Sequence, residues 1–173
     1  MGLPVGVNRV TNANIYVDGL GLLGRAEEIT IPDVKFKMVD HKGLGMFGTA
    51  EFPAGADKLE AKIKWASIYS EVSILLTPFT THQFQIYASI EQYTSQGRSA
   101  QLPYVAMMSG LFKDGGEMTF KQHENVEKTS SIAVYYLEEL VSGIQTKLYD
   151  VLANIYVSDG EDQLAQFTAN IGG

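Results

Sequence analysis

Strict alternation of apolar and charged residues runs through Leu59-Glu-Ala-Lys-Ile-Lys-Trp65, within a longer patterned segment, 58–66. Successive side chains of a strand point to opposite faces, so this alternation predicts a strand with one buried and one solvated face. Residues 83–91 repeat the pattern, with Phe84, Ile86, Ala88 and Ile90 as the apolar set. These two segments predict that the protein is built from half-buried strands.

The rest of the chain is also patterned as strands separated by turns. Strands are expected at 14–17, 100–112, 131–141 and 144–157. Between residues 26 and 39 the apolar phase changes, so we expect a bulge or bend at Pro32 and Asp33. The breaks between strands are turn-forming sequences: Asp18-Gly19, Ser95-Gln96-Gly97, Asp114-Gly115-Gly116, Ser142-Gly143 and Asp159-Gly160.

One segment, 68–79, has helical spacing instead. Apolar residues recur there at intervals of three, four and seven, with Ser67 or Ser70 as the N-cap and Pro78 near the end. The apolar face consists of Ile68, Tyr69, Val72, Leu75, Leu76 and Phe79. A shorter helix is expected over 161–170, with Leu164, Phe167 and Ile171 on one side and Gly172 as its stop. The predicted fold is mainly β: an antiparallel β-sandwich or open barrel with one flanking α-helix.

Composition limits the possible functions. The 173 residues suit a single domain over 1–173, and the formal net charge of −7 disfavours tight binding to nucleic acid through its phosphates. An acidic surface can still line a conduit through which DNA slides, because it repels phosphates. The chain has no cysteine, so disulfides, thiolate metal sites and cysteine nucleophiles are excluded.

The N-terminus lacks the basic and apolar regions of a secretory signal, and no apolar run approaches the roughly 20 residues needed to span a bilayer. We therefore expect folding in a cytoplasm and no membrane partner.

A loop of unusual composition lies between two strand-like segments, in Asp40-His-Lys-Gly-Leu-Gly-Met-Phe-Gly48. Its glycines permit positive φ angles, while its large apolar side chains require a surface to bury against. The loop either folds back on its own core or contacts another protein copy, and we favour the second. The expected inter-subunit residues are Asp40, His41, Lys42, Leu44, Met46 and Phe47.

We find no catalytic, metal or cofactor site in the sequence. Gly-x-Gly-x-x-Gly occurs twice, ending at Gly24 and Gly48, but neither match leads into the long helix that a dinucleotide site needs. No histidine pair has zinc-site spacing, and no Gly-x-Ser-x-Gly elbow is present. The histidines His41, His82 and His123 are expected to be structural or exposed. Carboxylates such as Asp114, Glu117 and Asp159 are expected in turns or on solvated faces.

Several segments, in order, resemble the major tail tube protein of contractile-tailed bacteriophages and of the related R-type pyocins. They are Asn14-Ile-Tyr-Val-Asp-Gly, Gly24-Arg-Ala-Glu-Glu-Ile-Thr-Ile-Pro-Asp-Val, Lys42-Gly-Leu-Gly-Met, Leu59-Glu-Ala-Lys, Pro103-Tyr-Val-Ala-Met-Met-Ser-Gly-Leu-Phe-Lys113, Val134-Tyr-Tyr-Leu-Glu138 and Asp162-Gln-Leu-Ala165. The similarity covers nearly the whole chain. Gln101 and residues 122–127 depart from the family pattern, so the resemblance does not assign the connection over 113–130.

The resemblance implies a structural protein, not an enzyme, that forms hexameric rings stacked into a hollow tube inside a contractile sheath. It implies an N-terminal arm over 1–13 and an extended inter-ring loop over 40–57. The implied partners are further copies of the chain, the tail sheath protein, the tape measure protein, and baseplate and terminator proteins. Genomic DNA would pass through without specific binding, and the protein would reside in the virion after assembly in the host cytoplasm.

Two alternatives remain open. The tube can belong to a DNA-free phage-tail-like bacteriocin, which the sequence does not distinguish from a phage tail. A monomeric β-barrel binding module is disfavoured because the single tryptophan, Trp65, lies on an apolar face and leaves no aromatic platform.

A tube lumen must be polar and weakly adhesive. Two solvated strand faces fit this description, and we assign them to the lumen: Glu60, Lys62 and Lys64 on one strand, and Gln83, Gln85, Ser89 and Glu91 on another. The opposing possibility is that one of these faces points outward and meets the sheath.

Overall fold

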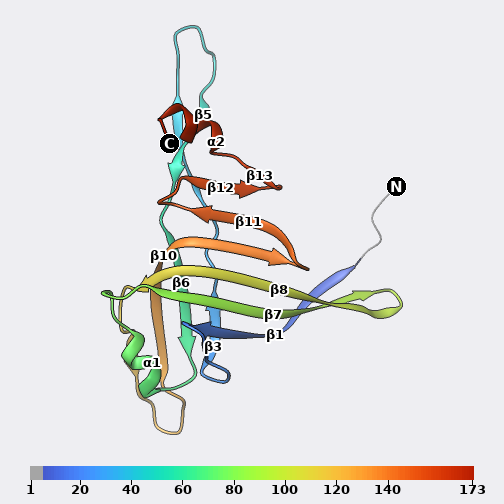
Figure 1. Ribbon diagram of the computed structural model, residues 1–173, viewed down its shortest axis with the longest axis vertical. Coiled ribbons are helices and arrows are strands. Elements are labelled where there is room, and N and C mark those ends of the chain that lie inside the picture. Colours follow the sequence, from blue (N-terminus) through green and yellow to red (C-terminus); the bar gives the residue numbers. More distant parts are fainter. Residues whose placement is uncertain (1–5) are drawn as a thin grey trace.

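The structure is a computed structural model that describes residues 6–173, and these residues form thirteen strands and two short helices (Figure 1). The strands are β1 Val7–Val17, β2 Leu20–Gly21, β3 Ala26–Thr30, β4 Phe36–His41, β5 Ala50–Ala56, β6 Leu59–Trp65, β7 His82–Thr94, β8 Gly97–Phe112, β9 Glu117–Thr119, β10 Glu127–Val141, β11 Ile144–Asp150, β12 Ile155–Ser158 and β13 Glu161–Asp162. The helices are α1 Ser70–Leu75 and α2 Ala165–Asn170. The mainly β, antiparallel prediction is confirmed.

One layer of the fold, here called the long layer, has the strand order β13-β12-β11-β10-β8-β7-β1-β2. All its pairs are antiparallel, and the β7–β8 pair runs from His82↔Gly110 to Thr94↔Gly97 with one irregularity between Gln92 and Tyr93. Figure 1 shows these strands stacked across the molecule.

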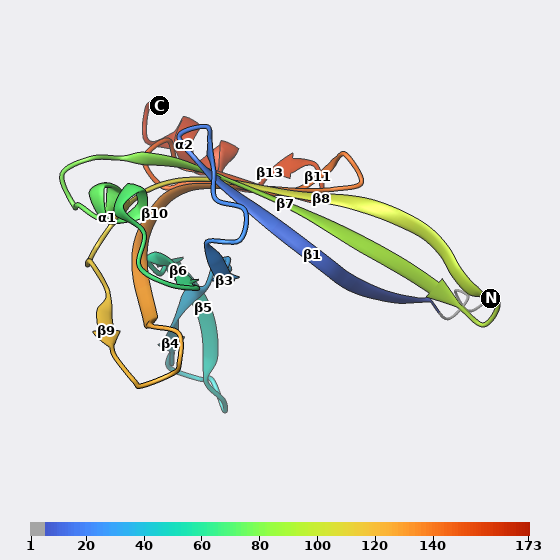
Figure 2. The ribbon, with the colours of Figure 1, turned by 90° about the horizontal axis from the view of Figure 1, so that it is seen from below.

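The second layer, here called the short layer, has the order β9-β10-β6-β3. Strand β10 belongs to both layers, because Lys128–Val134 pair with β6 whereas Tyr136–Val141 pair with β11. In Figure 1 the strands of the short layer run roughly at right angles to those of the long layer, and Figure 2 shows the two layers diverging from their shared strand. The result is an open sandwich.

The core lies between the layers, and the alternate apolar residues of β6 and the first half of β7 contribute to it. Ala88 and Ile90, which the pattern also assigned to the buried face, are only half-buried, because β7 extends there beyond the short layer. Trp65 is 1% exposed, and its indole N–H donates a hydrogen bond to Ser130 Oγ at 3.0 Å, which satisfies the polar atom inside the core. The buried apolar set is Ile15, Val17, Leu22, Val34, Leu59, Ala61, Ile63, Trp65, Val72, Phe84, Ile86, Ala106, Met108, Phe112, Ile132, Val134, Leu137 and Tyr149.

Some strand boundaries differ from expectation. The predicted strand 144–157 is two strands, because the Asp150 carboxylate accepts hydrogen bonds from the N–H groups of Leu152 and Ala153 and closes a turn. The break predicted at Pro32 and Asp33 is confirmed, since β3 ends at Thr30 and β4 begins at Phe36. Of the predicted N-terminal arm, residues 7–13 lie in β1, paired with β7, and residues 1–5 lie outside the described part of the chain.

Helix α1 is shorter than the predicted 68–79. It begins after Tyr69, which occupies the N-cap position in place of Ser67 or Ser70, and only Val72 within it is fully buried. Tyr69, Leu75 and Leu76 pack on the core as expected. Ile68 and Phe79 are exposed, so the prediction was wrong for both ends of the apolar face. The predicted helix 161–170 begins only at Ala165, because Glu161–Asp162 form β13.

Candidate assembly surfaces

A β-hairpin, β4–β5, projects from the body beyond the long layer at one end of the longest axis (Figure 1). Its register runs from Phe36↔Ala56 to His41↔Ala50, so half of the predicted extended loop over 40–57 is strand, and the connection between the two strands is 42–49. Large apolar side chains along the hairpin are exposed: Phe36, Met38, Val39 and Phe52. At its base, Phe36 contacts Tyr156 with ring centroids 5.3 Å apart, which anchors the hairpin to the body.

The tip of the hairpin separates the three apolar residues singled out in the sequence. Met46 folds back on Gly43. The Gly43 N–H donates a hydrogen bond to Met46 Sδ at 3.2 Å, and the Met46 N–H donates one to the Gly43 carbonyl oxygen at 3.1 Å. Leu44 and Phe47 have no cover at all, with exposures of 107% and 110%. Gly45 has φ +85°, a conformation that glycine adopts without strain. The tip therefore presents Leu44 and Phe47 to whatever it meets.

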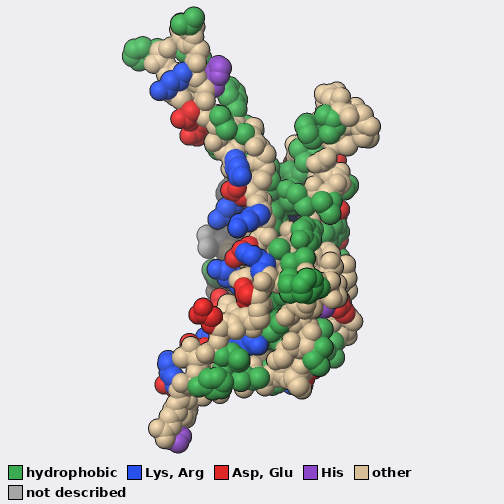
Figure 3. Space-filling view, turned by 90° about the vertical axis from the view of Figure 1, so that its left-hand side faces the viewer, with side chains coloured by type: hydrophobic (Ala, Val, Ile, Leu, Met, Phe, Trp, Pro, Cys, Tyr) green, Lys and Arg blue, Asp and Glu red, His purple; other side chains and the backbone are tan. Residues whose placement is uncertain are grey.

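All six predicted inter-subunit residues lie at this end of the hairpin. Asp40 and His41 are the last residues of β4, and Lys42, Leu44, Met46 and Phe47 follow in the connection. The His41 ring stacks edge-on against Phe52 with centroids 6.0 Å apart. Figure 3 shows apolar side chains at the far end of the projecting hairpin.

The outer face of the short layer is densely charged. Lys64 pairs with Glu27 at 3.1 Å, Lys62 lies 3.9 Å from Glu60, and Lys113 donates a hydrogen bond to Glu60. The hydrogen bond from Lys113 lowers the pKa of the Glu60 carboxyl and is the largest effect on it. Partial burial raises this pKa by a smaller amount. Carboxylates outnumber lysines on this face and at its rim, where the charged groups are Glu27, Glu28, Glu60, Asp114, Glu117, Glu127, Lys62, Lys64 and Lys113. Figure 3 shows charged side chains along the corresponding edge of the molecule.

The outer face of the long layer has a different chemistry. Gln83 and Gln85 lie opposite Ser109 and Met107, and Ser89 lies opposite Pro103. Apolar residues, all half-buried, share this face: Val105, Met107, Leu140, Leu148 and Val157. Farther along, Glu91 accepts a hydrogen bond from the Tyr93 hydroxyl at 2.7 Å, which raises the Tyr93 pKa, and pairs with Arg98 at 3.2 Å.

The two sets of predicted lumen residues do not lie on one surface of the subunit. Ile63 and Phe84 both point into the shared core, so Glu60, Lys62 and Lys64 face outward from the short layer. Gln83, Gln85, Ser89 and Glu91 face outward from the long layer, on the other side of the sandwich. A single subunit therefore offers two candidate lumen faces.

His82 is buried and structural, as predicted. Its Nδ1 lies 2.6 Å from Asp18 Oδ2 and its Nε2 lies 3.1 Å from the carbonyl oxygen of Leu75, which ties the end of α1 to the β1–β2 turn. Burial raises the Asp18 pKa, but hydrogen bonds from the Gln83 N–H and His82 outweigh burial and lower it.

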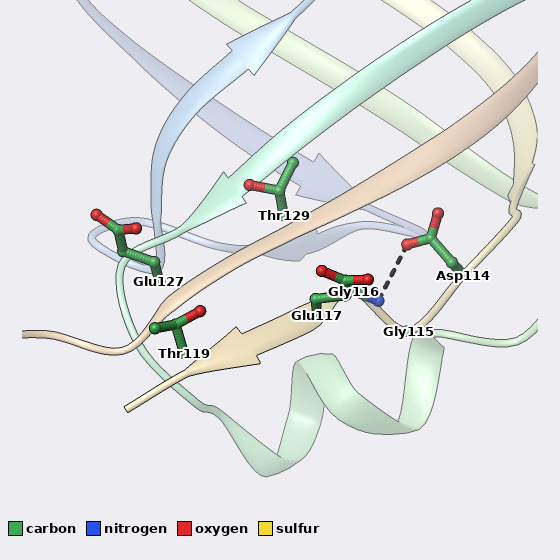
Figure 4. Close-up of a pocket in the computed structure, with 7 residues that line it drawn as sticks. All are labelled: Asp114, Gly115, Gly116, Glu117, Thr119, Glu127 and Thr129. Carbon is green, nitrogen blue, oxygen red and sulfur yellow. Dashed lines mark hydrogen bonds between the residues drawn. The ribbon is translucent and has the colours of Figure 1, made fainter. Parts of the chain in front are cut away.

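An acidic groove of about 660 Å³ lies at the β9 edge, lined by Asp114, Gly115, Gly116, Glu117, Thr119, Glu127 and Thr129 (Figure 4). The Gly116 N–H donates to Asp114 Oδ1 at 3.0 Å, and the Glu117 and Glu127 carboxylates lie apart. Within the described residues, no group of three His, Asp or Glu side chains is placed to hold a metal ion. Over the same residues, no helix is long and apolar enough to cross a membrane.

Two features escaped the sequence analysis. Strands β1, β7 and β8 extend together past the short layer as a three-stranded arm, visible at one end of Figure 2. The short layer also ends in two strands, β3 and β9, each paired on one side only within the described chain. Alternation could not reveal either feature, because it reports which face is apolar and not what covers it.

Comparison with known proteins gives two matches. The family model described as phage tail tube protein FII matches residues 7–172. The tail tube protein of Escherichia phage P2 is 24% identical over 169 residues, covering 92% of this chain and 94% of the phage protein.

Proposed function

The chain belongs to the phage tail tube protein family, and from this premise we propose that it forms hexameric rings that stack into the hollow tube of a contractile tail. In this proposal the tube is the conduit for genome delivery, and the subunit assembles in the host cytoplasm before joining the virion. The observation that carries the proposal is the hairpin β4–β5, which exposes large apolar side chains along its length and has Leu44 and Phe47 fully exposed at its tip.

Ring closure follows from the edges of the short layer. Strands β3 and β9 lie at its opposite edges, and an open edge is a template for pairing with another chain. We propose that β9 of one copy pairs with β3 of the next. A head-to-tail contact of this kind closes into a ring when the rotation from one copy to the next is a whole fraction of a full turn, without a rise along the axis.

We assign the lumen to the outer face of the short layer, the set Glu60, Lys62 and Lys64. Its charges of both signs are paired with one another, carboxylates are in excess, and its β6 positions carry no apolar side chain. Such a wall repels phosphates on balance and leaves few unpaired lysines to hold DNA. The long-layer face, with Gln83, Gln85, Ser89 and Glu91, then points outward toward the sheath, because its half-buried apolar residues suit a protein partner.

Stacking is assigned to the hairpin tip. Leu44 and Phe47 of one ring insert into the adjacent ring, where burial of each side chain stabilises the contact by roughly 1.5–3 kcal/mol. The tape measure, baseplate and terminator proteins then contact the lumen and the two ends of the tube.

Negative-stain microscopy of the purified protein tests the assembly. Rings or tubes of even diameter are expected, whereas single particles at all concentrations would favour a monomeric binding module.

Cysteine labelling tests the lumen assignment, since the chain has no cysteine of its own. In assembled tubes, Lys62→Cys should be shielded from a bulky maleimide and Gln85→Cys should react, while both react in disassembled protein. The reverse pattern would place the long-layer face inside.

A further inference from the structure

The three-stranded arm has one apolar face that the core of the subunit, over the described residues, does not reach: Ile90 and Leu102 on it are half-buried and Val10 is exposed. The face of β7 that places Phe84 and Ile86 in the core also carries Ala88 and Ile90 farther along the strand. The register places Val10 of β1 and Leu102 of β8 on either side of Ile90. This row points to the side on which the short layer lies, yet Ile90 and Leu102 do not pack on the core, and Val10 is 60% exposed.

The opposite end of the molecule has exposed apolar side chains of its own. Helix α1 closes that end of the sandwich with Val72, but Ile74 on the same helix is 78% exposed and Phe79 just after it is 94% exposed. Figure 2 shows α1 and the end of the arm at opposite sides of the molecule. Two different apolar surfaces at opposite ends are what a head-to-tail contact between copies requires.

Charge complements this arrangement. Arg9, Arg98 and Glu91 cluster near the end of the arm, which gives it a net positive charge in an acidic protein. The other end carries the groove carboxylates Asp114, Glu117 and Glu127. Opposite charges on the two ends favour head-to-tail encounter over head-to-head encounter.

We propose that the arm is a clasp that packs, through Val10, Ile90 and Leu102, on Ile74 and Phe79 of the next copy in the ring. The inference rests on the ring assembly of the proposed function, and the geometry of the two contacts agrees. Strand β3 lies on the arm side of the short layer and β9 on the α1 side, so pairing β9 of the next copy with β3 also brings its α1 beneath the arm (Figure 2).

Two complementary variants test the clasp. The arm variant carries Ile90→Glu and Leu102→Glu, and the helix variant carries Ile74→Glu and Phe79→Glu. The matched control carries Ser89→Glu and Gln101→Glu, which place the same charges on the opposite face of the same two strands. Circular dichroism and thermal melting establish that each variant is folded.

Sedimentation velocity then gives the assembly state. The wild type and the control should form rings at the same concentration, while each of the two variants should need at least about tenfold more protein. An equimolar mixture should form dimers where each variant alone is monomeric, because one intact clasp remains. Equal assembly by all proteins, or a mixture that stays monomeric, would overturn the clasp but leave the tube function standing. A wild type that never forms rings would remove both.

Cross-linking gives a readout that does not depend on introduced charge. In assembled protein, a short bismaleimide should join Leu102→Cys/Phe79→Cys subunits into a ladder of covalent multimers. Gln101→Cys/Phe79→Cys, with its first cysteine on the other face of the arm, should give little ladder. Equal ladders from the two proteins would contradict the proposed face.

Discussion

Strands β5 and β6 are separated by two residues and both contain apolar side chains, yet their burial is opposite. In β6, Leu59, Ala61, Ile63 and Trp65 are buried and the residues between them are not. In β5, which contains Phe52 and Pro53, no residue is fully buried. β6 has neighbours on both edges, β3 and β10, whereas among the described strands β5 pairs only with β4.

The difference shows that the chain carries two kinds of apolar surface. The apolar surface of β6 is buried when one subunit folds. The apolar surface of the β4–β5 hairpin stays exposed in one subunit, and we expect it to be buried by contact between subunits. A variant in the first region should therefore change the stability of the subunit, and a variant in the second should change assembly alone.

The largest effect is expected from Trp65→Ala. The side chain is 1% exposed, so its removal leaves a cavity and should lower the free energy of unfolding by about 3–5 kcal/mol. Urea unfolding of unassembled protein measures this. Ser130→Ala, which only orphans the indole N–H, should cost less, about 1–3 kcal/mol. An unchanged midpoint for Trp65→Ala would contradict the assigned core.

The hairpin counterpart is Leu44→Ser with Phe47→Ser. Both side chains are fully exposed, so the unfolding midpoint should not move, while stacking should lose up to roughly 1.5–3 kcal/mol per residue. Electron microscopy should show isolated rings in place of long tubes. Tubes of wild-type length would remove the role of the tip.

A substitution of glycine should also affect stability more in the core strands than in the hairpin. A Cβ at Gly110 in β8 would lie 2.3 Å from the carbonyl oxygen of Ala133 in β10, so Gly110→Ala must push two core strands apart, at a cost of about 1–3 kcal/mol. A Cβ at Gly48 in the hairpin connection would meet nothing within 4 Å, and Gly48→Ala should change stability by less than about 0.5 kcal/mol. Thermal melting of both variants is the measurement, and equal melting temperatures would contradict the close approach of β8 and β10.

The smallest effect on the stability of the subunit is expected when low pH protonates Glu60. The pKa of Glu60 in the folded protein lies below its ordinary value of 4.5, so the Lys113 pair stabilises the fold above that pH and its contribution disappears as the pH falls through the lowered pKa. At neutral pH, Glu60→Gln should lower stability by no more than about 1 kcal/mol, because the pair is partly exposed. Urea unfolding should show the two proteins converging below the lowered pKa. A gap that persists or widens in acid would contradict the pair.

Much of the subunit could be predicted from local pattern. The alternation in 58–66 and 83–91 predicted β6 and β7, and the Asp18-Gly19, Ser142-Gly143 and Asp159-Gly160 turns all have positive φ at both residues. The resemblance to tail tube proteins is confirmed by the family match over residues 7–172. Prediction failed at 151–154, where Val151 and Leu152 look like strand continuation but the Asp150 side chain closes a turn. It also failed at α1, where apolar spacing extended past the residues that reach the core.

The sequence by itself determined that the protein is an antiparallel β fold with a glycine-rich loop that carries large apolar side chains, because alternation and the placement of glycines are local properties of the chain. Only the tertiary structure decided that β10 serves two layers, that the polar faces of β6 and β7 point to opposite sides, and that the β1–β7–β8 arm extends beyond its cover. The physical reason is that a strand's alternation states which side chains share a face. What lies against that face depends on strand pairing between residues distant in the chain, and alternation alone does not specify that pairing.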